Sequence, residues 1–272
     1  MTDWEARVTR GTAPADRVDA ELRYAVAAPL LRDAALWVDL GCGTGVAAGA
    51  ALAAGGRPRA RAVLVDHDAE ALDVARQECG TEVAAVVHAD LGTPAGAAAV
   101  RDALTELGGA GPAVVVTCLH VLHQLADFTA LVELLLALGD DGAAVLVSVP
   151  DDAAGALDDP HRRSAWSAGA AEELRRLLPA GAVSLRQVAV RAGAIVPTGG
   201  GSVAVPLADV TIDAEAPAAA HLLAFGPGAE RLAPAGLARA ADLEAERGDA
   251  RRRESDLAYL EARLAALEAS SA

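Results

Sequence analysis

The sequence predicts a doubly wound α/β fold: a mostly parallel, seven-stranded sheet with an N-terminal helix and a C-terminal helical extension. Short apolar runs of strand length alternate with alanine-rich segments of helical length. The runs are apolar throughout, which is typical of strands buried on both faces of a parallel sheet. A glycine-rich turn follows the first run, at the place where open α/β sheets pass from their first strand to a helix.

The predicted elements follow one another in regular order. Ala15 to Leu31 has an amphipathic pattern and predicts the N-terminal helix, over about residues 15–32. In a later helix, Asp127 stands at the expected N-cap and Gly139 at the expected stop. Five strands separated by four helices indicate a sheet covered on both faces. The strands are expected at Leu36 to Leu40, Arg61 to Val65, Glu82 to His88, Ala113 to Cys118 and Ala143 to Val149, with helices at about 45–54, 69–79, 95–107 and 127–138.

Beyond residue 150 the alternation is looser. Ala170 to Leu178 has a helical pattern, Val183 to Val196 predicts a long strand, and His221 to Phe225 predicts a strand that closes the sheet. Residues 197–217 contain a run of glycines and are expected to carry an inserted hairpin. These segments complete the seven predicted strands.

The composition changes after Pro234 to Ala, Glu, Arg and Leu. We therefore expect one α/β domain over residues 1–232 and a C-terminal helix over residues 233–272. Leucines recur there at heptad spacing over about two heptads, fewer than the three or four that a lasting coiled coil usually needs. The helix could pack on its own domain, pair with a second copy in a homodimer, or continue into a longer stalk. The four leucines are Leu257, Leu260, Leu264 and Leu267.

The charge of the chain argues against two classes of partner. The formal net charge is -15 over 272 residues, and the longest basic run, Arg251 to Arg253, lies among acidic residues. Nucleic-acid binding draws much of its affinity from basic side chains that neutralise phosphates. We therefore expect no nucleic-acid partner, and an acidic surface also disfavours an anionic membrane.

Cysteine number and the N-terminal residues bear on location. Cys42, Cys79 and Cys118 are odd in number and have no C-x-x-C spacing, so they suggest neither a disulfide framework nor a zinc site. The first residues do not form a signal-peptide pattern, and there is no long uncharged apolar stretch. A cytoplasmic location is therefore expected.

The segment Val38 to Gly45 carries the main functional signal. Its glycines Gly41, Gly43 and Gly45 allow a tight turn and let a ligand approach the backbone closely. Asp39 precedes the first glycine, and a carboxylate there would repel a pyrophosphate but attract a cation. The spacing G-x-G-x-G also differs from the dinucleotide pattern. The loop therefore favours a cationic ligand.

This segment resembles the first motif of the class I S-adenosylmethionine (SAM)-dependent methyltransferases, and further motifs follow in the family's order over about residues 15–150. Asp66 takes the place of the family's ribose-binding acid, with His67 at the adenosine rim, whereas Asp68 is the expected cap of the next helix. Asp90 takes the place of the residue that bonds the adenine amino group, and the N–H of Leu91 serves a ring nitrogen. Thr117 opens the segment that lines the methionine end. The resemblance implies a SAM site made of Asp39, Gly41, Cys42, Gly43, Asp66, His67, Asp90, Leu91 and Thr117.

The resemblance implies SAM as cofactor and S-adenosylhomocysteine (SAH) as product, with in-line transfer of a methyl group. A hydroxyl acceptor also needs a base, and the candidates are His120, His123 and His161. A structural role for each histidine is the alternative. A magnesium ion is a further alternative, since four carboxylates follow the fifth strand: Asp151, Asp152, Asp158 and Asp159. Acidic residues are frequent throughout this chain, so this cluster is weak evidence for a metal site.

We therefore predict a methyltransferase that acts on a small-molecule or sugar acceptor, with oxygen as the methylated atom. Two alternatives stay open. One is N- or C-methylation of a secondary metabolite. The other is a SAM-binding scaffold subunit without catalysis, which the absence of an obvious base suggests and the complete set of binding motifs opposes.

Overall fold

In the computed structural model, the described part of the chain comprises residues 8–9, 12, 14–54, 60–80, 83–152, 162–188 and 218–232. Its strands form one seven-stranded sheet in the order β3-β2-β1-β4-β5-β7-β6. Neighbouring strands are parallel, except that β7 runs antiparallel to both β5 and β6. The strands are β1 (Leu36–Leu40), β2 (Arg61–Asp66), β3 (Val83–His88), β4 (Val114–Leu119), β5 (Ala144–Pro150), β6 (Val183–Gln187) and β7 (Ala220–Phe225).

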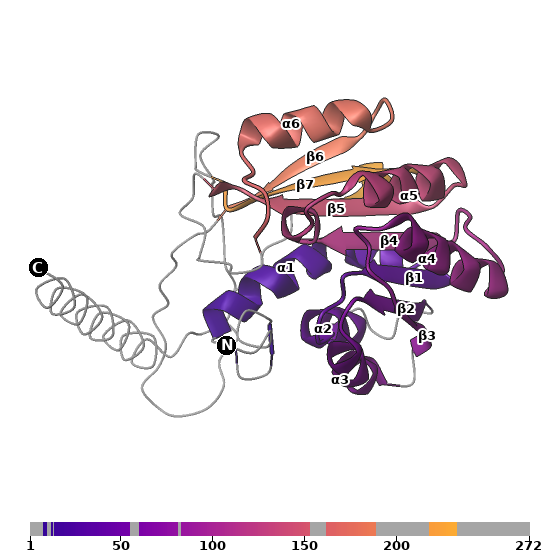
Figure 1. Cartoon of the computed structure of the whole chain (residues 1–272). Helices are drawn as coiled ribbons and strands as arrows, with labels where there is room; N and C mark the ends of the chain where they lie inside the picture. Colours follow the sequence, from indigo (N-terminus) through magenta and orange to yellow (C-terminus); the bar gives the residue numbers. More distant parts are fainter. Residues whose placement is uncertain are drawn as a thin grey trace, which may run out of the picture.

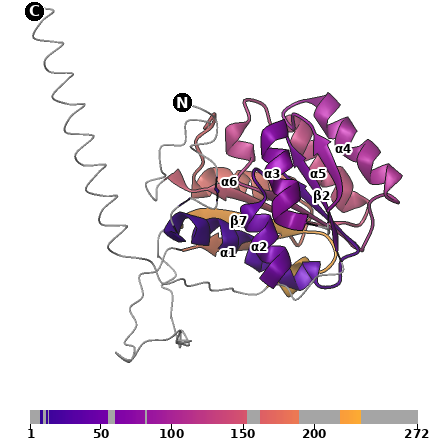
Figure 2. The ribbon, with the colours of Figure 1, turned by 90° about the horizontal axis from the view of Figure 1, so that it is seen from below.

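Helices cover both faces of the sheet (Figure 1). One face carries α1, α2 and α3, which lie next to one another in the view from below (Figure 2). The other face carries α4, α5 and α6. The bounds are α1 (Pro14–Leu31), α2 (Val46–Ala54), α3 (Ala69–Cys79), α4 (Pro94–Glu106), α5 (Thr129–Asp140) and α6 (Ala168–Leu177), with short 3-10 turns η3 (Leu122–Gln124) and η5 (Ala229–Arg231).

Each face of the sheet has its own hydrophobic core, because the central strands are buried on both sides. On the α4–α6 face, Val38 and Val116 pack with helix residues such as Leu131. On the α1–α3 face, Trp37 and Leu64 pack with the helix residues of that side. Burial on both faces explains why these strands read as continuous apolar runs.

The predicted fold class is confirmed, and most elements agree with their predicted bounds to within one or two residues. The predicted long strand from Val183 ends as β6 at Gln187. Its continuation, the predicted hairpin at 197–217 and the predicted C-terminal helix at 233–272 lie outside the described residues. The division into a domain and a helical extension therefore stays a prediction.

The predicted role of Gly139 as the end of a helix is wrong. Helix α5 continues to Asp140, and the glycine in the left-handed region is Gly142, with φ +96°. A Cβ added at Gly139 would lie 2.4 Å from a ring carbon of Phe225, so glycine is needed there for α5 to pack closely on β7. The predicted N-cap is wrong by one residue: Phe128 is at the cap position and its side chain makes no capping bond. Asp127, one residue earlier, accepts with Oδ1 from the N–H of Thr129 at 2.8 Å.

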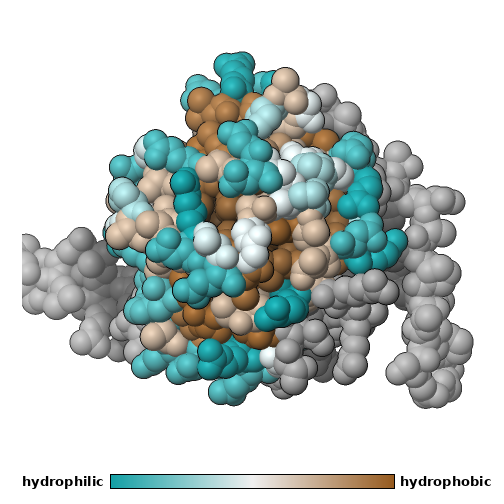
Figure 3. Space-filling view, turned by 90° about the vertical axis from the view of Figure 1, so that its right-hand side faces the viewer, coloured by the Kyte–Doolittle hydropathy of each residue, from teal (hydrophilic) through white to brown (hydrophobic). Residues whose placement is uncertain are grey.

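The parallel strands bring their carboxyl ends to one edge of the sheet, where open α/β folds bind their ligands. The glycine loop, the ends of β2 and β4 and the start of the antiparallel strand β7 all meet at this edge. Figure 3 faces the opposite edge, at which α4 and α5 end; hydrophobic and hydrophilic residues are intermingled there. The topology thus places every predicted site element that the structure describes on one side of the molecule.

Candidate functional site

The glycine loop turns sharply between β1 and α2. Gly41, Gly43 and Gly45 all have positive φ, from +56° to +76°. At Gly45 a Cβ would lie 2.7 Å from Cα of Ala75, so the glycine lets α2 approach α3. A Cβ added at Gly43 would meet nothing within 4 Å. The loop is therefore packed tightly at Gly45 but has open space at Gly43, which leaves room for a ligand beside the backbone.

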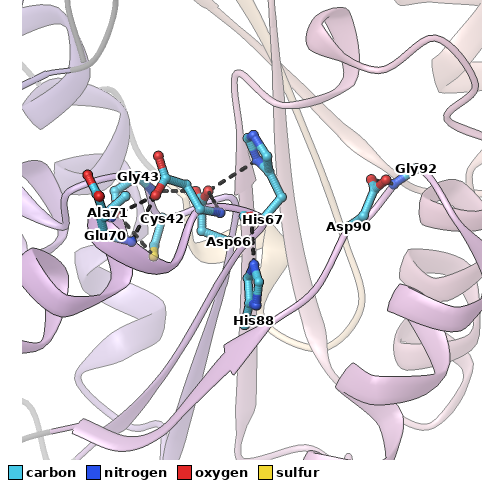
Figure 4. A network of polar contacts seen from close by, with 10 residues as sticks. Cys42, Gly43, Asp66, His67, Glu70, Ala71, His88, Asp90 and Gly92 are labelled. Carbon is cyan, nitrogen blue, oxygen red and sulfur yellow. Dashed lines mark hydrogen bonds and ion pairs between the residues drawn. The ribbon is translucent and has the colours of Figure 1, made fainter. Parts of the chain in front are cut away.

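Asp66 lies next to this open space (Figure 4). Its Oδ2 accepts from the N–H of Gly43 at 2.8 Å, and its Oδ1 accepts from the N–H of Asp68 at 3.1 Å. The Nδ1 of His67 is 3.2 Å from Oδ1, and the His67 side chain is largely exposed. The two main-chain bonds orient the Asp66 carboxylate beside the glycine loop, and a carboxylate is a group that can accept hydrogen bonds from both hydroxyls of a diol.

Asp68 is the N-cap of α3, as expected from its position. Its side chain accepts from the N–H groups of Glu70 and Ala71. The two neighbouring aspartates thus have separate roles: Asp68 begins the helix, and Asp66 faces the glycine loop.

Asp39 is fully buried at the end of β1. Its Oδ2 accepts from the hydroxyl of Tyr24 at 2.9 Å, and its Oδ1 accepts from the hydroxyl of Thr117 at 2.6 Å. Burial raises the pKa of Asp39 to about 7, the two hydrogen bonds oppose that rise, and the charge of Asp66 adds to it. Asp39 and Thr117 therefore lie directly beneath the predicted site without an exposed surface of their own.

Cys42 is a buried part of the loop rather than a reactive group. Its thiol contacts the carbonyl of Gly43 at 3.6 Å, and burial raises its pKa well above the ordinary value. A thiol in this state is a poor nucleophile.

Asp90 and Leu91 follow β3 beside the start of α4. The Asp90 side chain is exposed, and its Oδ1 accepts from the N–H of Gly92 at 2.9 Å, whereas Leu91 is buried. In Figure 4, Asp90 lies apart from the Gly43–Asp66 pair, as two ends of one extended ligand would require.

His120 and His123 come together after β4, with ring centroids 5.5 Å apart and nearly perpendicular planes. His120 is in the left-handed region at φ +57°, where its N–H meets both oxygens of Ser148. Its Nε2 is buried without a hydrogen-bond partner. Burial lowers the pKa of His120 well below the ordinary value, and the charge of Arg23 adds to this. His161, the third candidate base, lies outside the described residues.

Sequence reasoning missed a histidine–aspartate pair at the same edge of the sheet. The Nε2 of His221, on β7, is 2.7 Å from Oδ2 of Asp151, which follows β5. Their side chains are 13% and 7% exposed. No local pattern joins two residues 70 positions apart, because only the antiparallel pairing of β7 with β5 brings them together.

The predicted cofactor fits the residues that the structure brings together. A cationic, nucleoside-containing molecule needs a diol acceptor, space beside the glycine loop and negative charge at the methionine end. Asp66, Gly43 and Asp39 supply these in neighbouring positions. Within the described ranges, no group of three or more His, Cys, Asp or Glu side chains is placed to hold a metal ion, and no helix is long and apolar enough to span a membrane.

Comparisons with known proteins agree with this site. A family model described as a methyltransferase domain matches residues 15–194. A search of curated proteins finds no match.

Several solved methyltransferase structures are similar at low sequence identity. Cofactor-bound Rv0187 from MTB is 19% identical over 82% of this chain and 84% of that chain, with a TM-score of 0.43. The O-methyltransferase TomG from Streptomyces achromogenes is 18% identical, with coverages of 80% and 91% and a TM-score of 0.44. The N-methyltransferase NodS from Bradyrhizobium japonicum WM9 is 14% identical, with coverages of 80% and 97% and a TM-score of 0.42.

The family assignment rests on the family model, which matches more than half of the chain and includes every strand from β1 to β6. The order of the sheet and the arrangement of the glycine loop, Asp66 and Asp90 agree with it. This chain therefore belongs to the class I SAM-dependent methyltransferases, and it is an enzyme whose cofactor is SAM.

Proposed function

We propose that this enzyme transfers the methyl group to a hydroxyl oxygen of a small-molecule or sugar acceptor. SAM supplies an electrophilic methyl group, so the protein must align the acceptor and remove its proton. The observation that carries the proposal is the His221–Asp151 pair at the carboxyl edge of the sheet. A hydroxyl needs such a base during transfer, whereas a neutral amine can attack before it loses a proton.

His221 has the arrangement of a general base. Asp151 accepts from its Nε2 at 2.7 Å and so orients the ring. The other ring nitrogen has no hydrogen-bond partner among the described residues and is free to take a proton. His221 pairs in register with Val149 of β5, and His120 contacts Ser148 of the same strand. Two strand spacings, about 10 Å, therefore separate β7 from the end of β4.

His120 is a weaker candidate for this role. Its lowered pKa means that the protonated ring is disfavoured, chiefly by burial and then by the charge of Arg23. A general base works best when its pKa lies near the working pH. We therefore assign His120 to the lining of the site and His221 to proton removal.

Polar side chains around this edge support a hydroxyl-rich acceptor. Arg23 donates to Gln187 at 3.0 Å, and Gln187 in turn donates to Asp19. Arg162 pairs with Asp152. These polar residues belong to the elements next to the His221–Asp151 pair, and a polar lining suits an acceptor with several hydroxyl groups better than an apolar one.

The test is a panel of hydroxylated acceptors, sugars first, each paired with an amine of the same skeleton, for example glucose with glucosamine. SAH formation reports turnover, and NMR of the product identifies the methylated atom. We expect methyl on oxygen. Methyl on nitrogen or carbon would contradict the proposal and favour the alternative metabolite-methylating activities.

With the acceptor identified, His221→Asn is expected to lower kcat by about 10²-fold, the usual size of a general-base contribution. The affinity for SAM, measured by calorimetry, should stay unchanged, because His221 is on β7 and the predicted SAM residues lie on or directly after β1 to β4. Asp151→Asn should lower kcat less, since the histidine stays in place. Unchanged kcat in both variants would assign the pair a purely structural role.

A further inference from the structure

A buried chain of hydrogen bonds connects α1 to the first strand of the SAM site. The indole N–H of Trp37 donates to the hydroxyl of Thr117 at 2.7 Å, and that hydroxyl donates to Asp39 at 2.6 Å. Tyr24, on α1, donates to the other oxygen of Asp39 at 2.9 Å. Because Trp37 is a donor only, the hydroxyl hydrogen of Thr117 is left to point at Asp39. Both oxygens of Asp39 thus receive hydrogen bonds from neutral groups.

The surroundings of Asp39 contain negative or neutral groups. Asp66 contributes a negative charge from β2. The thiols of Cys42, Cys79 and Cys118 lie near enough, on the glycine loop, α3 and β4, for the charge of Asp39 to raise the pKa of each. Among the described residues, no cation forms an ion pair with Asp39. A buried carboxylate without a cationic partner is costly to ionise, and it attracts a cationic ligand strongly.

We propose that Tyr24 is a positioning residue of the SAM site: its hydrogen bond favours the ionised form of Asp39, and the charge of Asp39 then attracts the sulfonium and ammonium groups of SAM. Helix α1 is thereby a working part of the cofactor site rather than only a cover for the sheet. This proposal concerns only the binding of SAM, so it holds whichever acceptor atom the enzyme methylates.

The equilibrium between protonated and ionised Asp39 makes the effect of the Tyr24 hydrogen bond measurable by titration. Burial raises the pKa of Asp39 to about 7, and the hydrogen bonds from Thr117 and Tyr24 limit that rise. At neutral pH the free enzyme therefore contains both the protonated and the ionised carboxyl. A cation that binds nearby favours the ionised form, so SAM binding below about pH 7 should release a proton.

The alternative is that Tyr24 only anchors α1. Its ring packs edge-on against Trp37 at 5.8 Å between centroids, which is a stabilising contact in its own right. Tyr24→Phe keeps this packing and removes only the hydroxyl, so the variant separates the two roles.

The experiment is calorimetric titration with SAM from pH 6 to 8, in buffers of different ionisation enthalpy, so that proton release is measured together with affinity. The α-amino group of SAM titrates near pH 7.7–8.0, roughly, and contributes equally in every variant. For Tyr24→Phe we expect the midpoint of proton release to move up by about one pH unit. The ionised fraction at pH 7 then falls, and SAM binding weakens by about fivefold.

Three further variants serve as controls. Thr117→Val removes the second donor and should move the midpoint in the same direction. Asp39→Asn removes the carboxyl group, so only the proton released by the α-amino group of SAM should remain. Thr105→Val also removes one hydroxyl, which donates to the carbonyl of Arg101 on α4, away from the glycine loop. Its SAM affinity and proton release should match those of the wild type.

Two results would overturn the proposal. One is Tyr24→Phe with an unchanged midpoint and unchanged affinity, which would leave Tyr24 as an anchor of α1. The other is tighter SAM binding by Tyr24→Phe, which would mean that the hydroxyl competes with the cofactor. In either case SAM still binds, so the assignment of the cofactor is unaffected.

Discussion

Two opposing requirements apply to Asp39: its carboxyl group is buried, and its predicted role requires a negative charge. Its position in β1, between buried neighbours, excludes water from the carboxyl group. The function of the glycine loop calls for negative charge at the same place. Hydroxyl donors from Tyr24 and Thr117 reconcile the two demands, because hydrogen bonds to a charged group are stronger than those to a neutral one.

The protonation of Asp39 predicts a pH-dependent stability. The pKa of Asp39 is about 7 in the folded protein against 3.8 for the free group. Between these values the folded state holds a proton that the unfolded state has lost, so the contribution of Asp39 to stability falls as the pH rises from about 4 to about 7. The full cost, on the order of a few kcal/mol, applies above pH 7.

Asp39→Asn should remove this dependence. The side-chain amide can accept from Tyr24 and donate to Thr117, whose hydroxyl then turns to the carbonyl of Val38, 3.5 Å away. Thermal unfolding without SAM should show the variant gaining stability over the wild type as the pH rises from 4 to 7. Equal slopes for the two proteins in that range would show that Asp39 is ionised throughout.

At the scale of an element, the start of α4 shows how a helix fixes the position of Asp90, the residue predicted to bind the adenine amino group. Thr93 caps the helix, and its hydroxyl also donates to the carbonyl of Asp90 at 2.9 Å. Gly96, in the first turn, lies so close to Asp90 that an added Cβ would be 1.9 Å from the same carbonyl. The position of Asp90 therefore depends on a helix N-terminus packed directly against its backbone.

Gly96→Ala should both destabilise the protein and displace Asp90. We expect a loss of about 1–3 kcal/mol in the free energy of unfolding, typical of overpacking, because the contact is with backbone that cannot rotate away. SAM binding should also weaken in calorimetry. Gly111→Ala is the matched control, since a Cβ there meets nothing within 4 Å and its φ is not positive. A stable Gly96→Ala variant with normal SAM affinity would contradict this account of α4.

At the scale of the whole molecule, the site is assembled from strand ends that lie far apart in sequence and meet at one edge. The proposed SAM site includes several of these elements, so we expect SAM to stabilise the entire domain rather than one loop. For a ligand at about 100 times its Kd, linkage gives roughly 2.7 kcal/mol. In a domain of this size, that corresponds to a rise in Tm of about 5–10 °C.

Asp66→Ala should abolish this rise, because it removes the acceptor that faces the glycine loop. The neighbouring variant Asp68→Ala removes a helix cap and should lower Tm in the absence of ligand, by about 1 kcal/mol of stability. It should nevertheless keep the SAM-induced rise. Thermal unfolding with and without SAM or SAH measures both effects, and a full SAM response in Asp66→Ala would disprove the assignment of the ribose acceptor.

The amino-acid sequence by itself determined the fold class, the order of the elements and the location of the glycine loop. These properties follow from local patterns: strands buried on both faces must be apolar throughout, and a tight turn with positive φ requires glycine. The same reasoning assigned the cap to Asp68 and distinguished it from Asp66. It misjudged Gly139, since a glycine that permits close packing looks the same in sequence as one that ends a helix.

Only the tertiary structure decided which distant side chains share a site. The pairing of His221 with Asp151 depends on the antiparallel return of β7, and the bond from Tyr24 to Asp39 depends on how α1 packs across β1 and β4. The burial that raises the pKa of Asp39 is likewise a property of the packed sheet and helices. The physical reason is that hydrophobic periodicity acts over neighbouring residues, whereas hydrogen bonding and desolvation depend on every group that the fold brings within a few ångströms.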